Sequence, residues 1–233
     1  FKVLFFTRWI THYCAPVFMF LAGTSAFLVG QKKTKKQLSA FLLKRGLWLV
    51  FLELIVVNFG WNFAPNFPSF LFIVIWALGV SMIVLSALVH LPGKLILLIG
   101  IVLVAGHNLL DNVHVQGSGG AAFGWALLHD PNFFNWNGRN IFIGYPMIPW
   151  LGIMALGYCF GNLYKPAIDA ARRKQLLFIL GFSAIGLFIL LRATNIYGDA
   201  SHWTTQPTAL YTFLSFLKVT KYPPSLLYAL VTL

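Results

Sequence analysis

Residues 175–193 read QLLFILGFSAIGLFILLRA, an apolar stretch in which the single charged side chain, Arg192, lies close to the end. A helix needs about 20 predominantly apolar residues to cross the hydrocarbon core of a bilayer. This stretch meets that requirement and therefore predicts a transmembrane helix. The basic residues Arg172, Arg173 and Lys174 come directly before it, where positively charged side chains commonly flank a membrane-spanning helix.

The composition of the whole chain points the same way. Of the 233 residues, 59% are hydrophobic and only 9% are charged, whereas a soluble domain usually carries about 25% charged residues. So few charges cannot cover a water-facing surface, but a lipid-facing surface needs none. No polar linker divides the chain, so we expect a single domain over residues 1–233. The chain begins at Phe1 and stops at Leu233 within an apolar run, and we expect it to be a fragment that is incomplete at both ends.

The same criterion predicts an all-α fold, a polytopic bundle with six complete membrane spans and one truncated span. The second and fourth spans are short, and Arg45 and Lys94 at their ends are expected to snorkel toward the membrane surface. Gly157 and Gly161 in the fifth span, and Gly23, Ser25 and Ala26 in the first, predict close helix contacts because small residues let two backbones approach. The spans are predicted at residues 10–29, 46–62, 69–90, 95–110, 144–163 and 175–193, and from 222 onward.

The basic residues predict the orientation of these spans. The formal charge is +12, with 17 Lys+Arg against 5 acidic residues. Nucleic-acid binding is the usual interpretation of such a balance, but here the basic residues lie in short loops between apolar runs, so we expect no nucleic-acid partner. Most of them fall in residues 29–45 and 164–174, and the positive-inside rule places these loops in the cytoplasm. The loops at 111–143 and 194–221 then face outward.

The first candidate for chemistry is the run Gly106-His107-Asn108-Leu109-Leu110-Asp111-Asn112-Val113-His114, at the predicted outer end of the fourth span. On a continuing helix His107, Asp111 and His114 would share one face. A carboxylate one turn from a histidine fixes its tautomer and raises its basicity, which is the layout of a general base with its orienting partner. The same spacing would also suit a metal ion, or a polar helix end in the headgroup region. We assign His107 and Asp111 to catalysis, with Asn108 in support, and assign no metal.

Other polar residues near the predicted spans are weaker candidates. Arg8 and His12 lie at the outer mouth of the first span, and His12 is the second candidate for the base if it faces the same cavity as His107; otherwise it is an interfacial polar residue. Glu53 is the only acidic residue expected deep in the membrane, where an ionised carboxylate costs about 2.5–3.5 kcal/mol. It should therefore be protonated or paired, in a functional or a structural role.

The outer loops and the last apolar run add further candidates. Lys221 and Tyr222 open this run, followed by prolines that the first turn of a helix tolerates, and Lys221 either snorkels or binds an anionic group. Aromatic faces with nearby amides suit sugar rings, although an interfacial aromatic belt explains them as well. These outer-loop residues are Trp125, Trp136, Trp203, Tyr197, Asn135, Asn137, Asp199 and His202.

Several stretches together resemble a known family. They are Arg8 to Leu28, Arg45 to Trp48 with Leu52 to Leu54, Gly106 to Asp111, Tyr145-Pro146 with Ile148 to Trp150, and Thr220 to Ser225. The chain is similar over nearly its whole length to bacterial members of the DUF1624 family, which is related to the catalytic domain of heparan-α-glucosaminide N-acetyltransferase.

The resemblance implies a multi-helix membrane acyltransferase of the bacterial cytoplasmic membrane. It implies acetyl-CoA as the donor on the cytosolic side and a terminal glucosamine amine, or another sugar group, as the acceptor on the far side. The catalytic histidine of the relative falls near Lys2 here and does not carry over, and the family's first helix lies outside this sequence. We therefore expect an acyltransferase acting on an envelope sugar within the lipid bilayer, an arrangement compatible with homo-oligomers. A transporter or proton-conducting protein without covalent chemistry is the alternative, with Glu53 and the outer histidines on the ion path.

Overall fold

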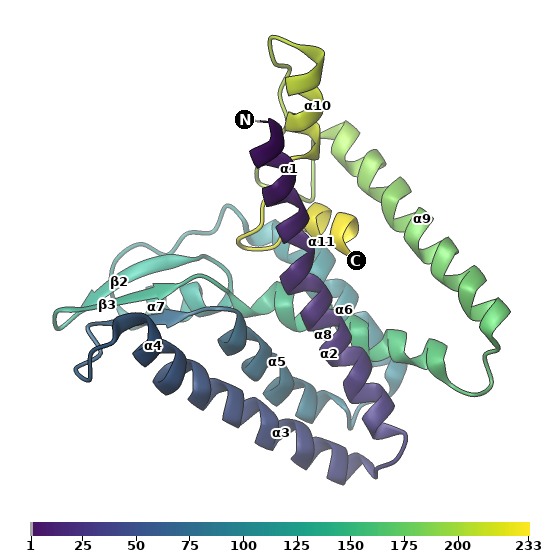
Figure 1. The fold of residues 1–233 in the computed structure, drawn as a ribbon, viewed down its shortest axis with the longest axis horizontal. Coiled ribbons are helices and arrows are strands. Elements are labelled where there is room, and N and C mark those ends of the chain that lie inside the picture. The colour runs from purple at the N-terminus through teal and green to yellow at the C-terminus, as the bar shows by residue number, and fades with distance from the viewer. Residues whose placement is uncertain (1) are drawn as a thin grey trace.

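The protein is described here by a computed structural model, which covers the backbone of residues 2–233 and the side chains from Phe5 onward (Figure 1). Helices dominate, as predicted. The N-terminal helical run comprises α1 (Lys2–Ile10), the short 3₁₀ helix η1 (Thr11–Tyr13) and α2 (Cys14–Gly30). A capping box at Thr34, whose side chain accepts from the Gln37 N–H, then starts α3 (Lys35–Phe51). The chain continues as a π-helical segment, η2 (Leu52–Val57), and α4 (Asn58–Asn62).

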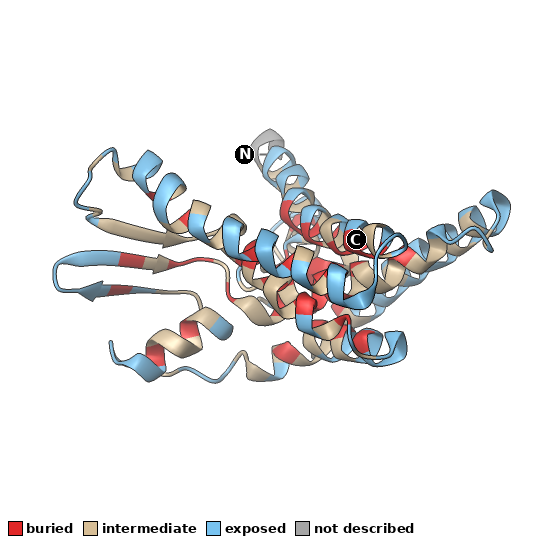
Figure 2. Ribbon diagram, turned by 90° about the horizontal axis from the view of Figure 1, so that it is seen from below, coloured by how far each residue is buried: buried red, intermediate tan, exposed pale blue. Residues whose placement is uncertain are grey.

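The remaining helices complete the bundle. They are α5 (Val74–Leu88), α6 (Gly93–Gly106) with the 3₁₀ turn η3 (His107–Leu110), α7 (Gly120–Leu128), α8 (Met147–Phe160) with η4 (Gly161–Tyr164), α9 (Ala170–Thr194), α10 (Ala209–Leu217) and α11 (Leu226–Thr232). Buried residues gather in the middle of the molecule, and exposed residues line the outer helices (Figure 2). Helix α8 provides the centre of the core, because Trp150, Ile153 and Met154 are fully buried there.

Among the described residues, three helical runs are long and apolar enough to cross a membrane: Phe5–Gly30, Gly93–Leu110 and Ala170–Thr194. They correspond to the predicted spans at 10–29, 95–110 and 175–193. Helix α9 leans away from the rest of the bundle (Figure 1). It exposes many large apolar side chains, including Phe178, Phe182 and Leu190, a surface that suits lipid and not water.

The prediction of six complete spans is not supported. Helix α5 has 15 residues, a length of about 23 Å at 1.5 Å per residue, which is short of the hydrocarbon thickness of about 30 Å. Helix α8 continues into η4, and this run is not among the three that are long and apolar enough. The helical run that holds the predicted span 46–62 begins at Lys35 and carries Lys44, Arg45 and Glu53, so its apolar part is too short. The run predicted from residue 222 onward holds only the seven residues of α11.

Small residues do bring two helices together at the places expected. A Cβ atom at Gly23 would collide with the backbone carbonyl of Met154, and one at Gly157 would collide with the carbonyl of Phe20. Helices α2 and α8 therefore pack backbone to backbone. The Thr24 hydroxyl adds a hydrogen bond of 2.9 Å to the Gly157 carbonyl. Ser25, predicted to take part, is exposed instead.

The all-α prediction is wrong in one region, where three short strands form a sheet in the order β1-β3-β2. Strand β1 (Ser69–Phe72) pairs in parallel with β3 (Arg139–Ile143), which pairs antiparallel with β2 (Asn132–Trp136). The turn between β2 and β3 uses positive φ angles at Asn137 and Gly138, as tight hairpins require. The predicted span at 69–90 therefore begins with a strand, and helix starts only at Val74.

Candidate active site

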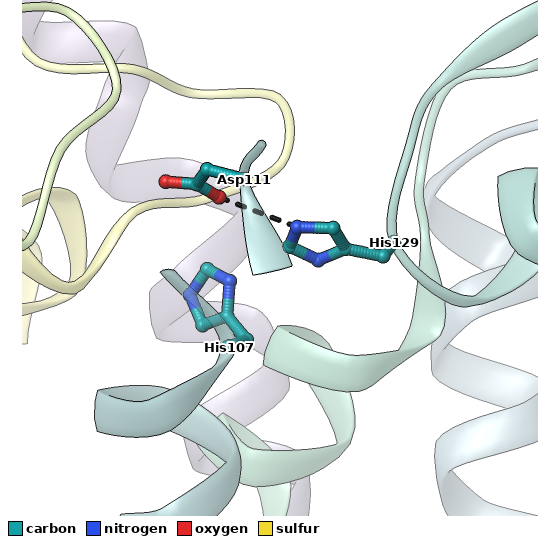
Figure 3. Close-up of side chains that lie close together, drawn as sticks. All are labelled: His107, Asp111 and His129. Carbon is teal, nitrogen blue, oxygen red and sulfur yellow. Dashed lines mark ion pairs between the residues drawn. The ribbon is translucent and has the colours of Figure 1, made fainter. Parts of the chain in front are cut away.

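Two histidines and one aspartate meet at the end of α6 (Figure 3). His107 begins η3, Asp111 follows η3 directly, and His129 follows the last residue of α7. The Nε2 atom of His129 lies 3.2 Å from Oδ1 of Asp111. The ring of His107 lies edge-on to the ring of His129, with centroids 5.6 Å apart. We call these three residues the His–Asp–His cluster.

The change from α6 to the tighter η3 decides which side chains join this cluster. The α-helix ends at Gly106, and the 3₁₀ turn keeps His107 and Asp111 close to each other. It does not continue far enough to keep His114 on the same face. His114 instead makes an exposed ion pair of 2.9 Å with Asp130. The predicted triplet of His107, Asp111 and His114 is therefore wrong in its third member, which His129 replaces.

The structure places His107 and Asp111 together, but the carboxylate of Asp111 makes its hydrogen bonds elsewhere. His107 is only 2% exposed. Neither of its ring nitrogens makes a hydrogen bond of good geometry among the described residues, and the backbone carbonyl of Pro224 is a weak acceptor near the ring. Asp111 Oδ1 faces His129, and Oδ2 accepts a hydrogen bond of 2.8 Å from the Asn108 side chain. The predicted orienting carboxylate is therefore paired with His129, and His107 lies beside that pair.

These hydrogen bonds also determine the charge state of Asp111. Burial alone would raise its pKa, but the hydrogen bonds from His129 and Asn108, together with the nearby imidazoles, outweigh burial and hold the pKa of Asp111 below its usual value. The carboxylate is therefore ionised at neutral pH. An ionised carboxylate only accepts hydrogen bonds, so the Nε2 atom of His129 carries a proton.

A cavity of about 160 Å³ opens beside the cluster. Asp111 and His129 line it from one side, and the segment from Thr220 to Ser225 lines it from the other. Asp199, which is buried, holds this segment in place. Its carboxylate accepts hydrogen bonds from the backbone N–H and the hydroxyl of Thr220, at 2.8 and 2.6 Å, and from the Ser225 hydroxyl at 2.8 Å. Asn108 fixes the same segment, since its Oδ1 accepts from the Leu226 N–H at 2.9 Å.

Like Asn108, Tyr222 is a predicted supporting residue that reaches this cavity. It contributes to the lining, and its hydroxyl lies 2.9 Å from the hydroxyl of Tyr145. The ammonium group of Lys221 lies over the Tyr222 ring, 5.3 Å from its centroid. Lys221 itself is not among the residues that line the cavity.

His12 and Arg8 lie in a different place from the one predicted. Both line a larger cavity of about 520 Å³, together with His202 and Lys218, and neither lines the cavity beside Asp111. The Nδ1 atom of His12 faces the backbone carbonyls of Arg8 and Trp9, at 2.9 and 3.1 Å. Since carbonyls only accept, this nitrogen carries the proton. The structure therefore does not bring His12 and His107 to one cavity.

Glu53 is fully buried, but it belongs to neither cavity. Its Oε2 atom accepts a hydrogen bond of 3.1 Å from the Trp76 N–H, in the first turn of α5. A carboxyl oxygen at this position satisfies one of the N–H groups that a helix leaves free at its start. Glu53 therefore caps the start of α5. The sequence left a functional and a structural role open for Glu53, and this contact favours the structural role.

The sequence alone did not predict the roles of two residues of the site, His129 and Asp199. His129 lies in the predicted outer loop at 111–143, and it was assigned no role from the sequence. Asp199 was considered only as a possible sugar contact, although as one of five acidic residues in the chain it is conspicuous. Which groups these side chains meet depends on how α7 and the loop after α9 fold back, and no local spacing reveals that.

Comparison with known proteins gives one match. A model of the family described as heparan-alpha-glucosaminide N-acetyltransferase, catalytic, matches residues 2–193. Searches of curated proteins and of solved structures found no significant match. The matched residues include α1 to α9, and with them all three residues of the His–Asp–His cluster. Together with the apolar helices, this match makes the chain an integral membrane protein that belongs to the heparan-alpha-glucosaminide N-acetyltransferase catalytic family, a family of membrane acetyltransferases.

Proposed function

We propose that this protein transfers an acetyl group from acetyl-CoA to an amine or hydroxyl of a sugar on the extracytoplasmic side of a bacterial cytoplasmic membrane. The proposal places the chain in the bacterial DUF1624 branch that its sequence resembles. The single observation that carries the choice of site is the pair of the half-buried Asp111 and the buried His129, 3.2 Å apart, at the edge of a cavity.

The pair has the chemistry that acyl transfer needs. Asp111 accepts the Nε2 proton of His129, so in the neutral ring the Nδ1 lone pair can act as a general base. This nitrogen is buried and has no hydrogen-bond partner among the described residues, so the acceptor has to enter the cavity and displace neighbouring side chains to reach it. The acceptor nitrogen or oxygen attacks the thioester carbonyl carbon, and His129 takes the proton that the acceptor loses. The carbon–sulfur bond then breaks, and the CoA thiolate leaves and is protonated from solvent. A positioned base of this kind contributes about 10²–10⁴-fold to the rate.

The position of the cluster supports an extracytoplasmic acceptor. The helical run Gly93–Leu110 has 18 residues, which corresponds to about 27 Å at 1.5 Å per residue. Lys94 lies at its start and Asp111 follows its end, so the two lie on opposite sides of a membrane that this helix crosses. With residues 29–45 and 164–174 in the cytoplasm by the positive-inside rule, the cluster faces outward.

Aromatic residues beside the cluster support a sugar as the acceptor. The ring of Trp125 lies 5.5 Å from the ring of His129, and Tyr222 lines the cavity. Sugars offer C–H faces that stack on such rings and hydroxyls that hydrogen-bond to them. A cavity of about 160 Å³ accommodates part of one sugar ring, so we expect a terminal sugar residue to be modified.

The test is acetyl transfer to glucosamine by the purified protein in permeabilised vesicles with a chelator present. His129→Gln and Asp111→Asn should each lower turnover about 100-fold or more, while the control His202→Gln, in the other cavity, should leave turnover unchanged. Full turnover in both cluster variants would refute the assignment of the base. If His12→Gln abolished turnover instead, the base would lie in the larger cavity.

A further inference from the structure

The His–Asp–His cluster has the composition and spacing of a metal site. We propose that His107, Asp111 and His129 bind one divalent transition-metal ion, such as zinc, with an open coordination position toward the cavity. The ligand atoms that the three side chains offer all lie within 4.8 Å of one another. Two imidazoles and one carboxylate, with the remaining position left for water, are a ligand set found in zinc sites that keep an open position.

One pair of ligand atoms already has the separation that a metal requires. With bonds of about 2.0–2.1 Å, two ligands of a tetrahedral zinc ion lie about 3.3 Å apart. The Nε2 atom of His129 and the Oδ1 atom of Asp111 are 3.2 Å apart. The ligand atom of His107 lies within 4.8 Å of the other two, so its ring has to approach them by up to about 1.5 Å to complete the set.

His107 supplies the independent observation that points to a ligand. Its side chain is 2% exposed, yet neither ring nitrogen makes a hydrogen bond of good geometry in the described part of the chain, and a weak contact with the Pro224 carbonyl serves one nitrogen at most. Buried polar atoms almost always have a partner. A metal ion between His107 and Asp111 would satisfy one nitrogen. The backbone carbonyl of Pro224, which acts on the ring as a weak hydrogen-bond acceptor, would accept the proton of the other.

The groups around the cluster would orient a metal ligand. Ligating carboxylates and histidines are usually held by a second layer of hydrogen bonds. Asn108 donates to Oδ2 of Asp111 at 2.8 Å, which leaves Oδ1 free to coordinate. Neither lysine nor arginine is among the residues lining the cavity, whereas Asp111 and Asp130 both are, so this pocket of a strongly basic protein favours a cation.

Metal binding and the proposed base exclude each other. A metal on Nε2 of His129 replaces the proton that Asp111 holds there, and Asp111 becomes a metal ligand instead of an orienting partner. The metal-bound form would therefore be inactive as the transferase described above. This consequence rests on the proposed function, but the metal site itself does not, since it can be measured without any turnover.

The test is metal binding by the purified protein in detergent, with any affinity tag removed and the metal stripped by a chelator. Cobalt(II) should give the intense visible absorption of a four-coordinate site, and zinc should displace it at one ion per chain. His129→Gln and Asp111→Asn should weaken cobalt binding at least about tenfold. The control His202→Gln, whose histidine lines the other cavity, should bind as the unmodified protein does.

Folding of the variants is checked by their thermal unfolding midpoints without metal, and the zinc-dependent rise of this midpoint in the unmodified protein gives a second readout. The proposal is overturned if the unmodified protein binds no cobalt and gains no stability from zinc. It is equally overturned if the cluster variants and the control bind alike. Acetyl transfer measured with the chelator would stand in either case, so failure of the metal site is distinguishable from failure of the proposed function.

Discussion

Replacing Gly157 with alanine should weaken the contact between α2 and α8, which holds the centre of the bundle together. A Cβ atom there would lie closer to the Phe20 carbonyl than real contacts allow, so the helices must separate by on the order of 1 Å to restore ordinary van der Waals distances. Such overpacking costs about 1–3 kcal/mol. The hydrogen bond from Thr24 to the Gly157 carbonyl, 2.9 Å long, would be strained, and bonds of this kind contribute about 0.6 kcal/mol in membrane proteins.

The higher helix propensity of alanine offsets about 1 kcal/mol of this loss. We therefore expect a net destabilisation of about 1–2 kcal/mol, which lowers the unfolding midpoint by about 3–6 °C for a chain of this size. The assay is thermal unfolding in detergent at a fixed scan rate, followed by the amount of monodisperse protein. Gly181→Ala is the matched control, because Gly181 lies in α9 with nothing within 4 Å of its Cβ position. Equal midpoints for the two variants would refute the backbone contact between α2 and α8.

Two further predictions concern buried carboxyl groups. Asp199→Ala should destabilise the protein by about 3 kcal/mol or more, because it removes the buried acceptor of several hydrogen bonds, and it should expose the loop before α11 to proteolysis. Asp130→Ala, which breaks only an exposed pair, should change stability by less than about 1 kcal/mol. Glu53→Gln keeps an acceptor for the Trp76 N–H. It should leave the rate of acetyl transfer unchanged and the free energy of unfolding within about 1 kcal/mol of the original. Loss of all function in this variant would favour the proton-conducting alternative.

The sequence was sufficient to predict the helices that are long and apolar over their whole length. The runs 10–29, 95–110 and 175–193 are long and apolar enough to be recognised without their neighbours, and the structure contains a suitable helix at each. The prediction of a helix over the whole of 69–90 was wrong at its start. The first residues of this run are apolar, and an apolar composition suits a strand as well as a helix. The Asn58 side chain, which exchanges hydrogen bonds with the backbone of Leu71, and the pairing with β3 make that part a strand.

The candidate site was predictable where it is local. His107 and Asp111 are close in the sequence and lie together in the structure. His129 joins them only because α7 ends beside η3, and His12 is separated from them because it faces the cavity near α10. Both outcomes depend on tertiary packing between segments far apart in the chain, for which the spacing of residues carries no signal.

The measurement that tests the account most directly is acetyl transfer across a sealed membrane. Vesicles containing the protein would enclose glucosamine, with radiolabelled acetyl-CoA added outside. Because the cluster and the basic loops are assigned to opposite sides of the membrane, we predict labelled product inside the vesicles, reduced about 100-fold or more by Asp111→Asn. Product no greater than in vesicles without protein, or undiminished by that substitution, would contradict the account.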